Sequence, residues 1–153
     1  MPRPSIPRAR LPRRQIEGCR CKYQEDAHCG AIRYEAQIEP ERVSICHCTD
    51  CQRLTGSAYR VTAPARPGSF TLILGEPRDY SKYGDSGGLS RQFFCPTCGS
   101  PLYRTDEEGG AIGIRLGSID QRRDLTPKKQ IWCRSALPWV GNIEPLPRFD
   151  SED

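Results

Sequence analysis

The chain has 153 residues, of which 36% are hydrophobic and 27% are charged. This length favours one domain, and so polar a chain builds only a modest core that added cross-links would help to stabilise. No apolar run approaches the roughly 18 residues of a membrane-spanning helix. The amino-terminal segment lacks the apolar stretch of a secretory signal, so we expect a cytoplasmic protein.

The net charge of +4 arises at one end of the chain. Residues 1–14, MPRPSIPRARLPRR, contain five Arg and four Pro and no acidic residue. The other 18 Lys and Arg face 19 Asp and Glu, which leaves the rest of the chain at −1. We therefore expect residues 1–15 to form a disordered basic arm, with a contact to nucleic acid as the sharper alternative.

The predicted elements are almost all strands and turns, because 14 Pro and 14 Gly argue against long helices. Residues 31–39, AIRYEAQIE, alternate apolar and polar side chains, which is typical of a half-buried strand. A short strand at 43–47 and a turn or single helical turn at 49–56 follow. Further strands are predicted at 69–75, 91–95, 101–105, 111–116 and 128–133, with hairpin connections at 83–90 and 107–110.

Nine cysteines are the strongest chemical signal: Cys19, Cys21, Cys29, Cys46, Cys48, Cys51, Cys95, Cys98 and Cys133. In a chain without a secretion signal, this number favours metal binding over disulfides. The spacings CRC, CHC and CPTC place neighbouring thiols poorly for pairing with each other but well for binding one ion.

The segment FCPTCGSPLY, residues 94–103, predicts a zinc knuckle between two strands. Cys95 and Cys98 flank a tight turn, and Gly99 follows where the backbone must bend close to sulfur. A thioredoxin-type redox pair has the same spacing but opens a helix, which Gly99, Ser100 and Pro101 disfavour. A knuckle supplies two ligands, whereas structural zinc has four in a tetrahedron.

The remaining two ligands are expected from the amino-terminal cysteines. Residues i and i+2 of a strand point to the same face, so Cys19 and Cys21 can both reach one ion. Cys29 can do the same with a neighbour. Cys19, Cys21 and Cys29 are therefore three candidates for the two remaining zinc ligands.

The stretch SICHCTDCQRLTGSAY, residues 44–59, holds a second group. Cys46 and Cys48 share one strand face, and Cys51 returns from the following turn. Three thiolates leave the fourth zinc position open, which distinguishes catalytic from structural sites. The alternative is a structural site completed by another cysteine such as Cys133, for which a buried free thiol is the preferred interpretation. His47 points to the opposite face, and we expect it to be hydrogen-bonded or exposed.

Five segments in order resemble the glutathione-dependent formaldehyde-activating enzyme family, also called the centromere protein V family: GCRC, CGAIRYE, CHCTDCQRLTGSAY, FCPTCGSPLY and QIWCRSALPWV. The resemblance runs from about Ile16 to Val140. It implies a zinc-binding domain at 16–140 followed by a tail at 141–153. The implied fold is all-β, β-tent-like, with small packed antiparallel sheets and two zinc sites, one structural and one catalytic.

The structural site departs from the family pattern, in which the early pair reads C-x-C-G-A. The end of this pattern matches residues 29–31, but residue 27 is Ala, and GCRC lies upstream with KYQEDAH as an apparent insertion. The predicted structural ligands are Cys29, Cys95, Cys98 and Cys21, with Cys19 as the rival of Cys21.

The resemblance implies carbon–sulfur lyase-type chemistry at the catalytic site of Cys46, Cys48 and Cys51. Glutathione is the implied co-substrate, and its thiolate adds to formaldehyde to give S-hydroxymethylglutathione, in either direction. Coordination to zinc deprotonates a thiol that is mostly protonated at neutral pH. Three thiolates weaken zinc as a Lewis acid, so thiol binding and positioning are favoured over carbonyl polarisation.

The expected partners are therefore a small-molecule thiol and an aldehyde, and neither a membrane nor nucleic acid is expected. One alternative is a non-catalytic zinc-stabilised binding module whose basic arm contacts nucleic acid. Another is a thiol-dependent lyase with a different substrate, because a family fixes a site better than a substrate. Arg53, Thr55 and Ser57 are candidate pocket residues, with ordinary turn and surface positions as the alternative. Four aromatic residues are predicted to belong to the core or rim: Tyr59, Tyr103, Trp132 and Trp139.

Overall fold

The computed structural model describes residues 22–84 and 87–151. The predicted basic arm, Cys19 and Cys21 lie outside these residues, and what we expect of them stays a prediction. Within the described ranges the strands are β1 (Lys22–Asp26), β2 (Arg33–Gln37), β3 (Ser44–Cys46), β4 (Arg60–Pro64), β5 (Thr71–Leu74), β6 (Arg78–Tyr83), β7 (Leu89–Phe94), β8 (Pro101–Thr105), β9 (Gly113–Arg115) and β10 (Lys129–Ile131). The helices are α1 (Thr49–Thr55) and the 3₁₀ turns η1 (Pro40–Arg42), η2 (Leu116–Ser118), η3 (Arg122–Asp124), η4 (Cys133–Ser135) and η5 (Pro138–Gly141).

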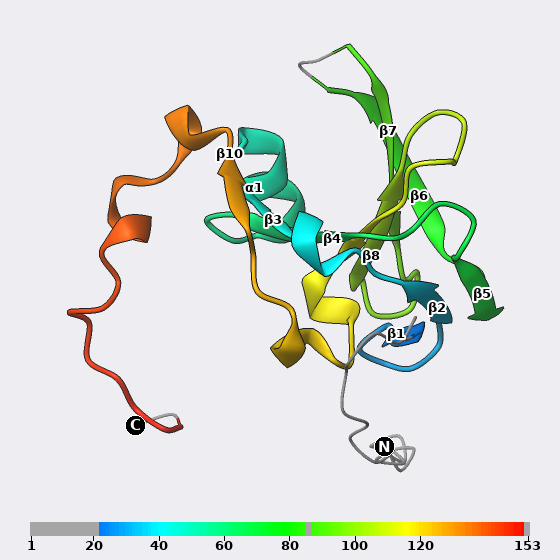
Figure 1. Ribbon diagram of the computed structural model, residues 1–153, viewed down its shortest axis with the longest axis horizontal. Helices are drawn as coiled ribbons and strands as arrows, with labels where there is room; N and C mark the ends of the chain where they lie inside the picture. The colour runs from blue at the N-terminus through cyan, green and yellow to red at the C-terminus, as the bar shows by residue number, and fades with distance from the viewer. Residues whose placement is uncertain (1–21, 85–86, 152–153) are drawn as a thin grey trace.

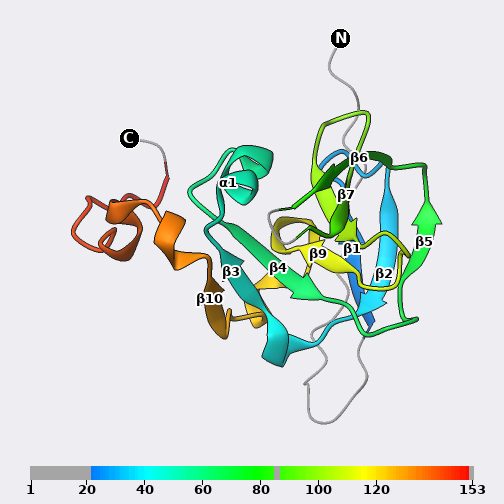
Figure 2. The same ribbon diagram turned by 90° about the horizontal axis from the view of Figure 1, so that it is seen from above.

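Two sheets account for the mostly-β architecture that the sequence predicts (Figure 1). The smaller sheet has the order β1-β2-β5, and the larger has the order β10-β3-β4-β9-β8-β7-β6 (Figure 2). The prediction of purely antiparallel sheets is wrong at one edge, because β10 pairs with β3 in parallel. The segment between β9 and β10, which contains η2 and η3, carries the chain past β4 and β3 to this edge of the sheet.

The alternation predicted for residues 31–39 is confirmed. Ile32, Tyr34, Ala36 and Ile38 are all at most 3% exposed and belong to the core between the sheets. Tyr34 donates its hydroxyl hydrogen bond to the Leu102 carbonyl at 3.1 Å, and its ring meets that of Tyr103 at 5.4 Å. This strand therefore joins the small sheet to the centre of the large one.

The large sheet has one apolar and one polar face, because successive side chains of a strand point to opposite faces. Ala63 of β4 and Ile114 of β9 are fully buried in the core. Their neighbours Arg60, Thr62 and Arg115 lie on the other face, together with Cys46, which pairs with Arg60 across the sheet. The polar face is where the functional site lies.

Three strands were not predicted from the sequence: β1, β4 and β6. The segment KYQEDAH, which we expect to be an insertion relative to the family pattern, contains a strand: its residues Lys22–Asp26 form β1 and pair along the whole of β2. The predicted single helical turn is a seven-residue α-helix, α1. No helix in the described part of the chain has the length and apolar character needed to cross a membrane.

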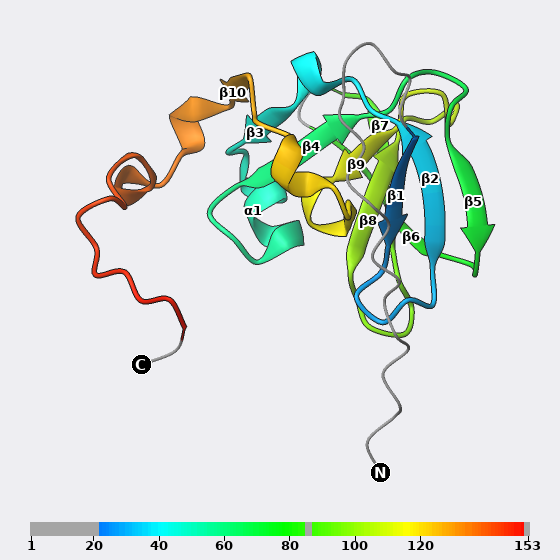
Figure 3. The ribbon, with the colours of Figure 1, turned by 60° about the horizontal axis from the view of Figure 1, so that its bottom comes forward.

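The segment after β10 leaves the sheets and runs along one side of the molecule (Figure 3). It contains η4 and η5 and exposes large apolar side chains, among them Trp139 and Phe149. The described part of the predicted tail, residues 141–151, lies in this projecting segment.

Candidate metal sites

The three-cysteine group predicted from CHCTDC is assembled at the junction of β3 and α1. The Sγ atoms of Cys46, Cys48 and Cys51 all lie within 4.8 Å of one another. Cys46 ends β3, Cys48 is the N-cap of α1, and Cys51 is in its first turn. Cys46 and Cys51 are buried, whereas Cys48 is partly exposed. The group is therefore reachable from solvent on the side of Cys48.

Helix α1 holds its cysteines through capping at both ends. The Cys48 Sγ accepts a hydrogen bond from the Cys51 backbone N–H at 3.3 Å, which satisfies one of the free amides of the first turn. Gly56 ends the helix with φ of 62°, a left-handed conformation that glycine adopts readily, and its N–H bonds to the Gln52 carbonyl. A short helix is thus fixed where its first turn presents two sulfur atoms.

Gln52 ties this helix to the segments beside it, and no local sequence pattern indicates this role. Its Nε2 donates to the His47 carbonyl at 2.8 Å and to the Ser135 carbonyl at 2.9 Å. One amide group therefore fixes α1 to the end of β3 and to η4.

His47 is turned away from the cysteines, as expected from strand alternation. It is 1% exposed, its Nε2 lies 2.8 Å from Gln130 Oε1, and its ring meets the Tyr59 ring at 5.7 Å. Because Gln130 presents an oxygen, Nε2 carries the proton, and Nδ1 is buried without a hydrogen-bond partner among the described residues. His47 therefore supports β3 rather than providing a ligand to the group.

Hydrogen bonds among the thiols shift the pKa values of Cys46 and Cys51 in opposite directions. A bond from the Cys51 thiol lowers the pKa of Cys46 to about 5 against the opposing effect of burial, and the charge of Arg60 acts in the same direction. The pKa of Cys51 is raised because its proton is shared with Cys46, with burial as the second cause. At neutral pH the metal-free group therefore already contains a thiolate.

A cavity of about 390 Å³ opens over this group on the polar face of the large sheet. Cys46, Cys48 and Cys51 line it, together with residues from β3, α1, β4, β6, β7, β8 and β10. At its rim, Lys82 and Asp50 form an ion pair at 2.5 Å. Arg60, Thr62, Gln92 and Arg104 line it as well, and they were missed because only strand pairing brings them to the cysteines.

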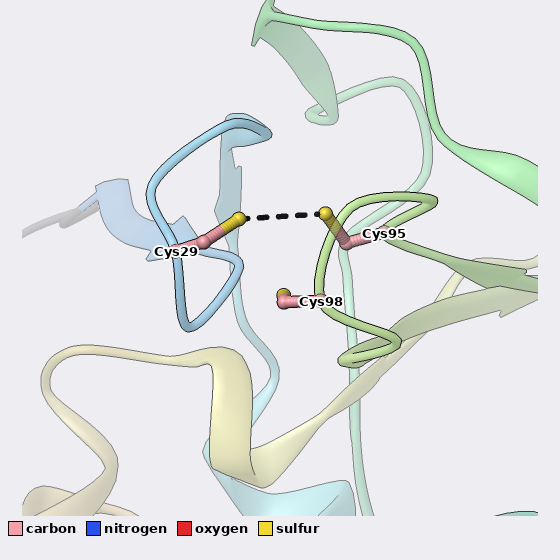
Figure 4. A group of neighbouring side chains, drawn as sticks. All are labelled: Cys29, Cys95 and Cys98. Atoms are coloured by element: carbon pink, nitrogen blue, oxygen red, sulfur yellow. Dashed lines mark hydrogen bonds between the residues drawn. The ribbon is translucent and has the colours of Figure 1, made fainter. Parts of the chain in front are cut away.

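The second group consists of Cys29, Cys95 and Cys98, whose Sγ atoms also lie within 4.8 Å of one another. Figure 4 shows Cys29 reaching from the β1–β2 turn toward the loop that carries Cys95 and Cys98. The Cys29 and Cys95 sulfur atoms are 3.7 Å apart. Cys95 is fully buried, and the other two are exposed.

The knuckle loop has the geometry that its sequence predicts. The Gly99 N–H bonds to the Cys95 carbonyl at 2.8 Å, and Gly99 has φ of 75°. Burial raises the pKa of Cys98, but hydrogen bonds from the Ser100 hydroxyl and backbone outweigh it and lower the value to about 6. The loop thus favours a thiolate at its exposed end.

Both groups fit a zinc ion in their donor set, although the Cys48 and Cys51 Sγ atoms, 3.0 Å apart, are closer than two sulfur ligands of one zinc ion. Two sulfur atoms bound to one tetrahedral zinc ion at about 2.3 Å lie roughly 3.8 Å apart, which matches the separation of Cys29 and Cys95. Each group offers three sulfur atoms, and within residues 22–84 and 87–151 neither group includes a fourth cysteine.

Several other predicted residues lie elsewhere. The prediction that Cys133 is a buried thiol is wrong, because it is exposed at the start of η4, where the chain leaves the sheets. Arg53 lies on the exposed surface, while Thr55 and Ser57 line a separate cavity of about 520 Å³. Among the aromatic residues, Tyr103 is in the core, and Trp139 is 55% exposed. Tyr59 lines the separate cavity, and Trp132 lines the cavity over the cysteines.

Comparisons with known proteins agree with this arrangement. Residues 22–135 match the family described as glutathione-dependent formaldehyde-activating enzyme. A Schizosaccharomyces pombe protein named as an uncharacterized lyase is 29% identical over 82 residues, which are 54% of this chain and 56% of that protein. The chain thus matches little more than half of that relative's length.

A solved structure supports the fold. The crystal structure of a Rhodobacter sphaeroides protein superposes with a TM-score of 0.55 at 21% identity, over 70% of this chain and 98% of that one. The family match spans both cysteine groups and most of the sheets, from the start of β1 to η4. The chain therefore belongs to the glutathione-dependent formaldehyde-activating enzyme family.

Proposed function

We propose that the protein is a zinc-dependent carbon–sulfur lyase-type enzyme that acts on an adduct of glutathione or a related thiol. The observation that carries the proposal is the three-cysteine group of Cys46, Cys48 and Cys51, which opens through Cys48 onto a cavity of about 390 Å³. A structural zinc site is closed, whereas an open position is what a catalytic site needs. Family membership and the relative named as a lyase support the same class of reaction.

The proposed reaction is the addition of a thiol to formaldehyde and its reversal. A sulfur–carbon bond forms as the carbonyl π bond breaks, and the proton lost by the thiol is taken up by the carbonyl oxygen to give a hydroxymethyl thioether. Zinc held by the three cysteines would supply a ligand position at which the incoming thiol is a thiolate near neutral pH. The cavity would hold the aldehyde beside that sulfur, which supplies proximity and orientation.

We also propose that Cys29, Cys95 and Cys98 bind a second, structural zinc ion, with Cys21 as the fourth ligand. Zinc at this site would tie the β1–β2 turn to the β7–β8 loop, two segments far apart in the sequence. Such a link stabilises a small fold by closing a long loop. The proposed partners are a small-molecule thiol and an aldehyde, in the cytoplasm, where thiols stay reduced.

The test is catalysis of exchange between formaldehyde and glutathione, followed by NMR with carbon-13-labelled formaldehyde. The protein should accelerate exchange between free formaldehyde and S-hydroxymethylglutathione, and Cys48→Ser should abolish the acceleration. Cys133→Ser is the matched control, because this exposed cysteine belongs to neither group. If Cys48→Ser accelerates the exchange as much as the natural chain does, the three-cysteine group is not the catalytic site. If the natural chain does not accelerate it, formaldehyde is not the substrate.

A further inference from the structure

A row of cationic side chains lies on the sheet face that carries Cys46. In the β3–β4 pairing, Cys46 lies opposite Arg60, and residues opposite one another in an antiparallel pair share a face. Thr62, two residues further along β4, lies opposite Arg115 of β9. Arg60 and Arg115 therefore lie on one face with the cysteine, and we call them, together with Gln92, the arginine layer.

Gln92 joins the two guanidinium groups of this layer. Its Oε1 accepts a hydrogen bond from Arg60 Nη1 at 3.2 Å and another from Arg115 Nη2 at 2.5 Å. Its own Nε2 donates to Ser90 Oγ at 2.7 Å, which orients the amide. Arg115 Nη1 also donates to Thr62 Oγ1 at 3.0 Å. The layer is thus a connected network rather than a set of mobile surface chains.

The layer carries positive charge that no ion pair among the described residues offsets. Arg115 is only 5% exposed, and burial together with the charge of Arg60 lowers the pKa of Arg115 to about 9. Among the described residues, neither arginine takes part in any of the ion pairs, which are Arg42–Glu39, Lys82–Asp50 and Arg91–Asp79. A buried charge without a counter-charge is costly, so a negative group should lie nearby.

A third guanidinium adds to the same charge. Arg104 lies opposite Gly113, and a Cβ at Gly113 would come within 3.4 Å of Arg104 Cγ. The absence of a side chain at Gly113 therefore lets Arg104 lie across β9 toward Thr62. Arg104 lines the same cavity as Arg60 and the cysteines.

The two acidic residues that line the cavity over the cysteines have other partners, and Asp26 and Asp120 line the separate cavity, to which Arg60 and Arg115 also contribute. Asp50 is paired with Lys82 at the rim, and Asp106 accepts the backbone N–H groups of Gly110 and Ala111 at 2.8 and 3.1 Å. Among the described residues that line this cavity, the cysteine group is the source of negative charge that neither an ion pair nor backbone amides engage. Three cysteinates that bind one divalent cation retain one excess negative charge.

We propose that Arg60 and Arg115, joined by Gln92, are positioning residues whose charge offsets the excess negative charge of a soft divalent cation bound by Cys46, Cys48 and Cys51, and so raises the affinity of the group for that cation. The inference rests on the proposed function, because it requires that this group bind metal. Since two guanidinium groups outweigh one excess negative charge, the occupied site would also favour an anionic ligand, such as a thiolate, at its open position.

The test is the zinc affinity of the full chain, measured by competition with a chromogenic chelator, with zinc alone as the probe. Cys48→Ser identifies which phase of zinc release belongs to the three-cysteine group. In that phase, Arg60→Gln should weaken zinc binding by about tenfold or more, as expected for the loss of a charge that lines the same cavity as the cysteines. Arg60→Lys, which keeps the charge, should have a zinc affinity within about threefold of the natural chain. Arg78→Gln, on the exposed surface of β6, is the matched control.

Gln92→Glu provides a second variant that keeps the shape of the network. A carboxylate at this position would neutralise the arginines in place of the cysteines, so zinc affinity in the same phase should fall while the fold is retained. Unchanged affinity in both Arg60→Gln and Gln92→Glu would overturn the inference. Absence of any Cys48-dependent phase in the natural chain would instead overturn the proposed function.

Discussion

The sulfur atoms of Cys48 and Cys51 lie 3.0 Å apart, because Cys48 is the N-cap of α1 and Cys51 belongs to its first turn. Cys48 thus has two separable roles, as a sulfur donor to the group and as the cap of the helix. A hydroxyl can cap a helix in place of sulfur, but it is a much poorer zinc ligand.

Replacement of Cys48 separates these two roles. Cys48→Ser should lose the zinc ion of the three-cysteine group and thiol-dependent activity. Its free energy of unfolding without metal should stay within about 1 kcal/mol of that of the metal-free natural chain. Cys48→Ala should lose the same activity and about 1 kcal/mol more stability, because it also removes the cap. Urea unfolding of the metal-free proteins measures the difference. A Cys48→Ala variant with full activity would contradict the catalytic assignment.

Gln52 should prove structural, although it lies next to a cysteine of the site. Gln52→Ala removes both hydrogen bonds from its Nε2 and leaves the carbonyls of His47 and Ser135 without them. We expect a loss of about 1–3 kcal/mol in the free energy of unfolding. Amide hydrogen exchange of residues 131–136 should become faster as well. Arg53 is the exposed neighbour, and Arg53→Ala should change the free energy of unfolding by no more than about 0.5 kcal/mol. Equal losses of stability in the two variants would contradict the role of Gln52.

The fourth ligand of the structural site can be tested by moving a cysteine. Ala27 is fully buried in the turn that carries Cys29, two residues away, where the family pattern has Cys. If Cys21 is the natural fourth ligand, Cys21→Ser should weaken zinc binding at this site, and adding Ala27→Cys should restore it. Ala27→Ser in the same background is the control for size. Zinc affinity that Cys21→Ser leaves unchanged would direct attention to Cys19.

A buried carboxyl group makes stability depend on pH. Glu25 is 2% exposed, and neither of its carboxyl oxygens has a hydrogen-bond partner in the described structure. Burial, followed by the charges of Asp120 and Glu35, raises the pKa of Glu25 from 4.5 to about 9. The folded state binds the proton of Glu25 more tightly than the unfolded state does. The free energy of unfolding therefore decreases as pH rises from 4.5 toward 9.

Glu25→Gln should therefore stabilise the protein most at alkaline pH. Each pH unit within this window is worth at most about 1.4 kcal/mol, so the gain should be a few kcal/mol larger at pH ~8 than at pH ~5. Denaturant unfolding of both proteins across this range measures it. A difference that is constant with pH would show that Glu25 has an ordinary pKa.

What the sequence predicts well is local. The alternation of residues 31–39 follows from a period of two, and each cysteine group has members within six residues of one another, which adjacent spacing reveals. The segment of β1 was misread because Glu25 occupies a core-facing place between Tyr23 and Ala27, which hides the apolar alternation.

What the sequence does not reveal is set by contacts between distant strands. Arg60 meets Cys46 only through the β3–β4 register, and Gln92 reaches both arginines from β7. The parallel β10 depends on the path of a long connection rather than on its own residues. Such pairings carry no local pattern, so no reading of one segment could have found them.

The central claim is that an open metal site lies beside a structural one. The most direct test is the zinc content of the purified full chain under reducing conditions, with and without glutathione. The account predicts two zinc ions per chain, one in Cys48→Ser, and a change in the X-ray absorption spectrum of the Cys48-dependent ion when glutathione is added. One zinc ion in both proteins, unaffected by glutathione, would contradict it.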